Sequence, residues 1–366
     1  MLYIRATGSI SPQKTFGQAP FLTDPVEYTG NRLNCIEPDY KEIIDGKLIR
    51  RMSRIIKMGV AAAMECLKEA AVTVPDAIVT GTAYGCLQDT EVFLKRIVEN
   101  KEEMLTPTAF IQSTHNTVGA QIALMLQCHH YNNTFVHRGF SFESALLDGM
   151  TLLLENPGTR VLVGGVDEIT DTSHAILSRL GLYRQELHST RELFAGPSKG
   201  TVAGEGAAFF LLADNPSETD YARLEGITTF YHPRTIIATE EAISSFLASQ
   251  QIKTGDIDLI ITGRNGDEKN DAGYLSLAAS VFSDIPAVNY KDLCGEYPTS
   301  TAFALWLAAN ILKTGRLPAA VKVSGQPPLQ SRQTGSGEKP GRGPQRILIY
   351  NNYLNRHHSL LLVSAC

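Results

Sequence analysis

The chain has 366 residues, of which 43% are hydrophobic and 19% are charged, and its formal net charge is -5 at pH 7. This length suits one large or two fused α/β domains with a sizeable buried core. The balanced, weakly acidic composition excludes a disordered chain and one that coats nucleic acid. We therefore expect no DNA or RNA partner.

The start of the chain, MLYIRA, lacks the long apolar region and the small-residue cleavage site of a secretion signal. No run approaches the roughly 18 apolar residues that span a bilayer. The six cysteines form no CxxC pair, and the nine histidines form neither HxxxH nor HExxH. The expectation is a cytoplasmic protein with free thiols and without a membrane span, metal or cofactor.

Short apolar runs alternate with segments of helical periodicity along the chain, which is typical of parallel sheets with crossover helices. An apolar stripe predicts a core-packed helix over 52–67, whose opposite face is basic. A second helix is expected over 302–312, ended by Lys313 and Gly315. Buried strands are expected, in chain order, at 79–80, 134–136, 161–163, 259–261 and 347–349. The pattern indicates an α/β fold.

The polar stretch at Asn215 and Pro216 separates two apolar strands and places a boundary between two halves, 1–214 and 215–366. Residues 324–345 are rich in Gly, Pro, Ser and charge, which predicts a mobile surface loop. The chain is expected to finish as a hairpin, RILIYNN followed by SLLLVSA.

Several of these segments, taken in order, resemble the β-ketoacyl-acyl-carrier-protein synthase family. They are YIRATGSISP, IRRMSRIIKMGVAAAMECL, PTAFIQSTHNTVGAQIAL, RVLVGGVDE, KGTVAGEGAAFFLL and NYKDLCGEYPTSTAFALWLA. The resemblance covers nearly the whole chain. It implies a thiolase-like layered αβαβα sandwich of two similar halves, a ketosynthase-like one up to 214 and a thiolase-like one from 215, that dimerises through a shared edge.

The nucleophile of the resembled family is a cysteine at a strand-to-helix elbow. Here the elbow reads VHRGFSFESALLDG, and counting back from Gly164-Gly165 places Phe140, or Gly139 with a one-residue shift, at that position. Neither side chain can form a thioester, so the acyl chain has no anchor.

The other catalytic positions of the family are also changed. Arg264 takes the place of the first histidine, and a guanidinium cannot cycle a proton. The family's lysine is kept as Lys291, but Glu296 replaces the second histidine, where a carboxylate would repel a developing enolate. A family carboxylate becomes Leu305, and the Gly-rich turn becomes the bulkier 351–357. We expect Arg264 and Glu296 to form an ion pair.

These losses resemble the chain-length factor, the silent partner of an active ketosynthase, as in aryl polyene, flexirubin and dialkylresorcinol pathways. The implied partners are the active ketosynthase subunit and, through it, an acyl carrier protein. Helical spacing would place Phe110, Thr114 and Thr117 along the acyl tunnel at the dimer interface. His115 and Asn116 on the same helix are interpreted as hydrogen-bonding structural groups.

An alternative is an acyltransferase or thioester hydrolase with a rebuilt site, in which His137 activates Ser141 or Ser144. Ser141, next to the elbow, is the better candidate, because Ser144 lies inside the helix. Burying the charge of Glu143 without a partner would cost free energy, so Glu143 is expected to meet Arg138 or a residue of the partner.

Overall fold

The computed structural model describes residues 1–17, 21–321, 323–324 and 343–366. Most of the loop expected at 324–345 lies outside the described residues. The strands are β1 (Leu2–Ile10), β2 (Ala77–Gly81), β3 (Tyr131–Phe135), β4 (Arg160–Asp167), β5 (Gly206–Ala213), β6 (Ala222–Tyr231), β7 (Leu259–Thr262), β8 (Ala287–Asn289), β9 (Val323–Ser324), β10 (Arg346–Tyr353) and β11 (His357–Ser364). The α-helices are α1 (Gly46–Ile49), α2 (Arg54–Glu69), α3 (Leu87–Glu99), α4 (Pro107–Gln112), α5 (Thr117–Leu126), α6 (Ser141–Glu155), α7 (Asp171–Arg179), α8 (Ile236–Ser249), α9 (Glu268–Ala279), α10 (Lys291–Cys294) and α11 (Thr301–Thr314). Short 3-10 helices are η1 (Tyr40–Glu42), η2 (Arg138–Phe140), η3 (Thr190–Glu192) and η4 (Thr254–Asp256).

The strands of the described chain pair in the order β3-β2-β4-β5-β1-β6-β11-β10-β7-β8-β9. From the middle outward, β1-β5-β4-β2-β3 has the same pattern as β6-β11-β10-β7-β8. In the first run, β1–β5 and β5–β4 are antiparallel, and β4–β2 and β2–β3 are parallel. In the second run, β6–β11 and β11–β10 are antiparallel, and β10–β7 and β7–β8 are parallel. The two runs meet where residues 2–4 pair with 222–224. The molecule therefore consists of two similar halves.

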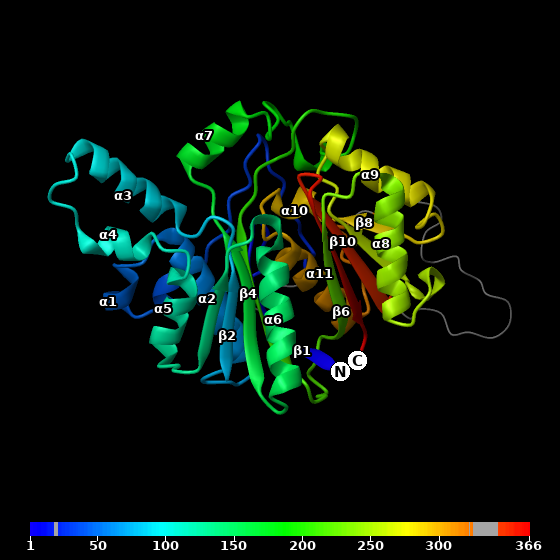
Figure 1. The fold of residues 1–366 in the computed structure, drawn as a ribbon, viewed down its shortest axis with the longest axis horizontal. Coiled ribbons are helices and arrows are strands. Elements are labelled where there is room, and N and C mark those ends of the chain that lie inside the picture. Colours follow the sequence, from blue (N-terminus) through cyan, green and yellow to red (C-terminus); the bar gives the residue numbers. More distant parts are fainter. Residues whose placement is uncertain (18–20, 322, 325–342) are drawn as a thin grey trace.

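The helices lie in layers around these strands (Figure 1). One face of the first run packs with α2 and α5, and the outer face of the second packs with α8 and α9. The inward side chains of both runs share one core with α6 and α11. Because strand side chains alternate between the two faces, each run of strands packs against a helix layer on both of its faces. The result is an αβαβα arrangement.

The sequence patterns explain the placement of the helices. The residues of α11 are buried on nearly all sides, as a helix that is hydrophobic all round requires, and Gly315 ends it with φ 65. The apolar stripe of α2 is buried as predicted. Its basic face is only partly solvent-exposed, because Arg54 donates to both carboxylate oxygens of the buried Glu205 at 2.5 Å.

The predicted strand segments lie in β2, β3, β4, β7 and β10, and β10 pairs antiparallel with β11 as the expected final hairpin. The proposed interface helix is divided into α4 and α5 with a break at 113–116. The hydroxyls of Ser113, Thr114 and Thr117 donate to the nearby carbonyls of Phe110, Ile111 and Thr114. Such local bonds compete with the helical pattern. None of the helices in the described ranges is long and apolar enough to cross a membrane.

Candidate functional site

The elbow connects β3 to α6 through η2 and lies against the turn between β10 and β11. Arg138, the first residue of η2, has φ 50 in the left-handed region, and the following residues Gly139 and Phe140 are buried. Gly139 and Phe140 thus directly precede α6 at a strand-to-helix elbow.

Aromatic side chains close the elbow. The ring of Phe140 packs edge-on against His357 with centroids 4.8 Å apart, and against His137 at 5.5 Å. A Cβ at Gly139 would lie 2.8 Å from Tyr353 and 2.9 Å from the Cβ of His357. The turn residues thus occupy the space beside the elbow, and neither Gly139 nor Phe140 offers a nucleophilic atom.

Lys291 and Glu296 form a buried ion pair. The lysine Nζ lies 2.6 Å from the glutamate Oε1, and both side chains are almost fully buried. Lys291 also donates to the hydroxyl of Ser300, and Asn265 Nδ2 donates to Glu296 Oε2 at 2.7 Å. Every charged atom of the pair thus has a partner, which a buried ion pair needs in order to offset its desolvation.

The expected ion pair between Arg264 and Glu296 is wrong. Arg264 Nε instead lies 3.2 Å from Asp271 Oδ2 in the first turns of α9, and its guanidinium stacks 5.3 Å from the ring centre of Phe194. Asp271 is held by the backbone N–H groups of Asn265 and Gly266, which draws Arg264 toward α9. Lys291, only five residues before Glu296, is the nearer cation for that carboxylate.

Glu143 lies inside the central layer and does not meet Arg138, one of the two groups expected to contact it. Its Oε1 accepts a 2.8 Å hydrogen bond from the Ser359 hydroxyl, whereas its Oε2 has no partner in the described part of the chain. Burial raises the pKa of Glu143 to about 7. A buried carboxyl group with a raised pKa is protonated more readily than an exposed glutamate, which reduces its need for a cationic partner.

The predicted Ser141 and His137 pair is not formed. The Ser141 hydroxyl is fully buried, donates to the carbonyl of Arg138 at 2.8 Å and accepts from the backbone N–H of His137. The His137 imidazole Nδ1 lies 3.4 Å from the hydroxyl of Ser144. The rebuilt-site alternative therefore loses its preferred serine, and Ser144 is the one within reach of the imidazole.

The predicted tunnel residues lie on an exposed part of the first half. Phe110 is 57% exposed and packs against Phe93 of α3 with ring centres 5.4 Å apart. The hydroxyls of Thr114 and Thr117 lie 3.0 Å apart. Thr114 lies in the break between α4 and α5 and Thr117 begins α5, so a local turn and not one continuous helix brings the two threonines together.

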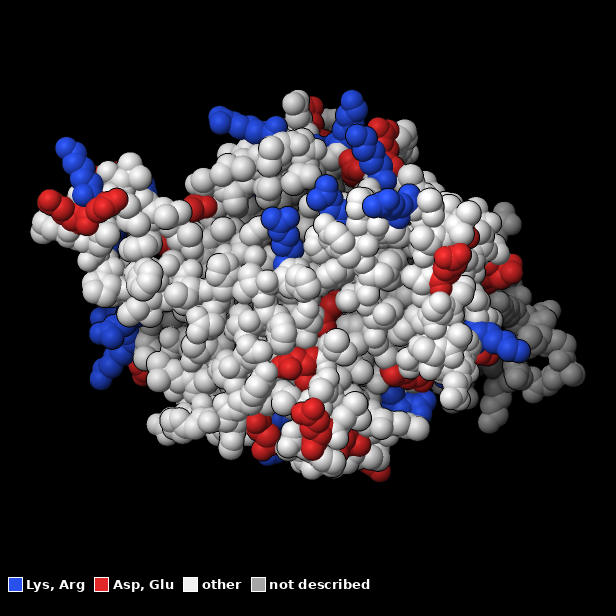
Figure 2. Space-filling model, viewed as in Figure 1, with Lys and Arg blue, Asp and Glu red and all other residues white. Residues whose placement is uncertain are grey.

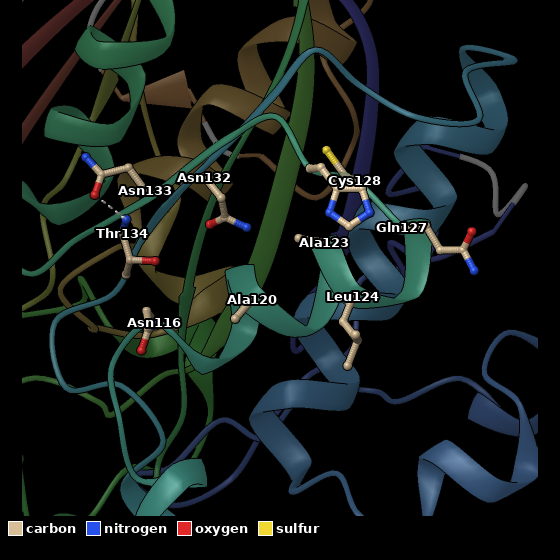
Figure 3. Close-up of a pocket in the computed structure, with 10 residues that line it drawn as sticks. Asn116, Ala120, Ala123, Leu124, Gln127, Cys128, Asn132, Asn133 and Thr134 are labelled. Atoms are coloured by element: carbon tan, nitrogen blue, oxygen red, sulfur yellow. Dashed lines mark hydrogen bonds between the residues drawn. The ribbon is translucent and has the colours of Figure 1, made fainter.

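Asn116 lines an open groove between α5 and β3, with a volume of about 780 Å³. Its other walls include Leu124 from the helix and Asn132 and Thr134 from the strand (Figure 3). The Asn132 amide donates to the carbonyl of Gly119 at 2.9 Å and so joins the strand to the helix. His115 lies outside this set, against Gly85, where a Cβ would come within 2.9 Å of its Cα.

Sequence reasoning missed the polar residues that complete the buried network. Tyr290 donates to Asn351 Oδ1 at 2.9 Å, and Asn351 donates to the Thr301 hydroxyl at 2.9 Å. Asn265 and Tyr290 follow β7 and β8, Asn351 lies in β10, and Ser300 and Thr301 lie at the start of α11. A usable signal was that Asn265 comes three residues after the apolar strand β7 and that Asn351 lies near the C-terminal end of the apolar strand β10, where parallel strands gather functional side chains.

A family model matches part of the chain. Residues 38–180 match the family described as the N-terminal domain of beta-ketoacyl synthases. The sequence matches no curated protein.

Solved structures similar to the whole chain include ketosynthases and chain length factors. The ishigamide ketosynthase/chain length factor has a TM-score of 0.81 at 17% identity, over 100% of this chain and 99% of that one. The ketosynthase ApeO in complex with its chain length factor ApeC from Xenorhabdus doucetiae gives 0.74 at 17%, over 100% and 98%. The AntDE:AntF complex, a type II PKS acyl-carrier protein with its ketosynthase, gives 0.72 at 15%, over 100% and 99%. The chain thus has the thiolase-like fold of these structures over its whole length, and its residues 38–180 are similar to the N-terminal domain of beta-ketoacyl synthases.

Proposed function

We propose that this chain is a catalytically silent, chain-length-factor-like subunit. It pairs with an active β-ketoacyl-ACP synthase and shapes the acyl tunnel in polyene, polyketide or fatty-acid-like biosynthesis. The observation that carries the proposal is the elbow, where Gly139 and Phe140 provide no nucleophile and Tyr353 and His357 occupy the space beside them.

The groups at the former histidine positions are also engaged elsewhere. Glu296 is bound by Lys291 and Asn265, and Arg264 is bound by Asp271. Polarising a thioester carbonyl requires donors that are free to point at the developing oxyanion. Glu296 is a carboxylate and offers no donor, and the Nε of Arg264 is already bound to Asp271, which supports a silent subunit.

The surface of the first half supports pairing with another subunit. Strand β3 ends the sheet and is paired on one side only, with β2. Much of the face formed around α6 carries neither Lys, Arg, Asp nor Glu, and charges gather toward its rim (Figure 2). Leu124 on α5 is 68% exposed, and Leu147 and Leu154 on α6 are 54% and 69% exposed. An open strand edge beside exposed leucines suits an obligate interface, which commonly buries about 2,000 Å² or more.

Structural neighbours support the choice of partner. ApeO is a ketosynthase in complex with its chain length factor, and in AntDE:AntF a carrier protein is in complex with its ketosynthase. We therefore assign an active ketosynthase as the direct partner of this chain, and an acyl carrier protein as a partner reached through that ketosynthase.

The first experiment tests catalytic silence. The purified chain is incubated with acyl- and malonyl-carrier thioesters, and its intact mass is measured, with the active ketosynthase as the positive control. No acyl adduct is expected. An adduct that disappears in Ser144→Ala would instead establish the acyltransferase alternative, because Ser144 lies 3.4 Å from the His137 imidazole.

The second experiment tests the interface. The chain is co-expressed with the ketosynthase encoded beside it, and the pair is separated by size exclusion. Leu154→Lys should break the heterodimer, whereas Leu180→Lys, an equally exposed leucine at the end of α7, should leave it intact. A wild-type chain that elutes as a monomer in the presence of the ketosynthase would contradict the proposal.

The third experiment tests the tunnel. Thr114→Trp should shorten the products of the reconstituted pair, because added volume at this position would block the tunnel. Phe110→Ala should lengthen them, because the Phe110 ring would form its floor. Chromatography of the products decides this, and unchanged lengths in both variants with an intact heterodimer would remove these residues from the tunnel.

A further inference from the structure

A further cavity lies in the second half of the molecule, between helix α9 and the strands β7, β8 and β10. Its volume is about 190 Å³, and it shares no lining residue with the elbow or with the groove beside β3. The buried side chains of Ile260, Leu277 and Phe282 form an apolar inner wall. Leu275 and Ala278 of α9 also line it and are exposed, so they form its outer rim. Apolar walls with a few polar groups are typical of sites for small ligands.

Two hydroxyl groups that line this cavity are already paired. The hydroxyl of Thr262 donates to Asn289 Oδ1 at 2.6 Å. The hydroxyl of Tyr350 lies 2.9 Å from His358 Nδ1. Both groups thus have hydrogen-bond partners within the fold.

The hydroxyl of Tyr274, which also lines the cavity, is different. Tyr274 is 4% exposed, and its hydroxyl oxygen has no hydrogen-bond partner among the described residues. Burial raises the pKa of Tyr274 well above its usual value, so the hydroxyl keeps its proton and remains a donor. A buried donor without an acceptor is costly, and an acceptor on a ligand would remove that cost.

Arg264 brings a cation to the same part of the cavity. A Cβ at Gly263, the preceding residue, would lie 2.7 Å from the Tyr274 hydroxyl oxygen, so this hydroxyl reaches the chain just before Arg264. The guanidinium stacks on the ring of Phe194. Its hydrogen bond within the described chain runs from Nε to Asp271, which lies outside the cavity lining. The two terminal nitrogens of Arg264 are therefore available to a ligand.

We propose that this cavity binds a small monocarboxylate with an apolar body. The carboxylate would accept hydrogen bonds from the terminal nitrogens of Arg264 and from the Tyr274 hydroxyl, and the hydrocarbon would pack against Leu277 and Phe282. One guanidinium beside a neutral hydroxyl matches a single negative charge. A cavity of about 150 Å³ can hold benzene, so the volume of about 190 Å³ suits a molecule of the size of benzoate or hexanoate. The proposal does not depend on pairing with a ketosynthase.

The test is a ligand-observed NMR titration of the purified protein with benzoate, hexanoate and benzamide. Both carboxylates should bind with a dissociation constant of about 1 mM or less. Benzamide has nearly the same shape as benzoate without the charge and should bind at least about tenfold more weakly. The tighter of the two carboxylates shows whether the cavity prefers a ring or a chain. A failure to form the heterodimer would leave these titrations interpretable.

Variants test the individual contacts. Arg264→Met should weaken benzoate binding about tenfold, and Tyr274→Phe should weaken it about fivefold. Ala278→Trp places a large ring on the exposed rim and should reduce binding at least about tenfold by blocking access. The matched control is Ala279→Trp, which adds the same ring at the next exposed residue of α9, outside the lining, and should bind like the wild type. Thermal melting of each variant distinguishes a lost ligand contact from a lost fold.

Any of four results would overturn the proposal. They are an equal affinity for benzoate and benzamide, unchanged benzoate binding in both Arg264→Met and Tyr274→Phe, an equal loss in Ala278→Trp and Ala279→Trp, and no binding of either carboxylate at about 10 mM, where even weak specific binding is measurable.

Discussion

The two sides of the closed site are filled in different ways. At the elbow, the ring of Phe140 packs against His357, and Gly139 lies directly against Tyr353. On the other side, Lys291 and Glu296 form a fully buried ion pair. Aromatic side chains thus fill the elbow side, and a pair of opposite charges fills the other side.

This difference has an energetic consequence. The packing of the rings depends on their shape. The free-energy cost of a substitution there therefore increases with the side-chain volume that is added or removed. A buried ion pair depends on the presence of both partners, since either charge left alone keeps its desolvation penalty. Variants on the charged side should therefore be the more destabilising, and the following predictions test that order.

The largest effect is expected for Lys291→Met. This change leaves the carboxylate of Glu296 buried without its cation and should lower the free energy of unfolding by about 3–5 kcal/mol. Urea unfolding measures the loss. The double variant Lys291→Met with Glu296→Leu should regain part of the stability, and a single variant that unfolds like the wild type would show that the pair contributes nothing.

The next effect concerns the pH dependence of stability, through Glu143 beneath the elbow. Its pKa of about 7 in the folded protein lies above the ordinary value of 4.5, so the folded state binds the proton more tightly than the unfolded state. Its contribution to stability should fall as pH rises from 4.5 to about 7, by about 3 kcal/mol. Glu143→Gln should remove this dependence.

The measurement for Glu143 is the difference in unfolding free energy between the wild type and Glu143→Gln at several pH values. This difference cancels the contributions of other buried acids with raised pKa values, which include Asp167, Glu168 and Asp271. A difference that stays constant between pH 4.5 and 8 would contradict the prediction.

A smaller loss is expected for Gly139→Ala on the ring side. The added Cβ would lie 2.8 Å from the Cβ of Tyr353 and 2.9 Å from that of His357, and these atoms cannot move without the backbone. Overpacking of this kind costs about 1–3 kcal/mol. Gly273→Ala in α9 is the matched control, because nothing lies near the added methyl, and it should be neutral or stabilising. Equal melting temperatures for Gly139→Ala and the wild type would mean that the elbow is not tightly closed.

The smallest effect is expected for Arg264→Met. Arg264 remains partly exposed, and Asp271 keeps its hydrogen bonds from the backbone of Asn265 and Gly266. The loss should be about 1 kcal/mol or less. A loss as large as that of Lys291→Met, measured by the same urea unfolding, would show that Arg264 belongs to the essential buried network.

The sequence by itself determined the elements and the order in which they follow one another. The apolar stripe that predicted a helix over 52–67 lies in α2, and the buried run at 302–312 lies in α11. Hydrophobic periodicity records which side of an element is buried, so it is readable without knowing the neighbours. The absence of a nucleophile at Gly139 and Phe140 is likewise a property of the side chains alone.

Only the tertiary structure decided which polar groups meet. Opposite charges at Arg264 and Glu296 suggested a pair, yet Asp271 lies closer to Arg264, and Lys291 lies closer to Glu296. Likewise, the buried Glu143 accepts from Ser359, which is 216 residues away in the sequence. Such contacts depend on distances of a few ångström between separate strands and loops, and Coulomb and hydrogen-bond energies fall steeply over that range. No local pattern in the sequence encodes them.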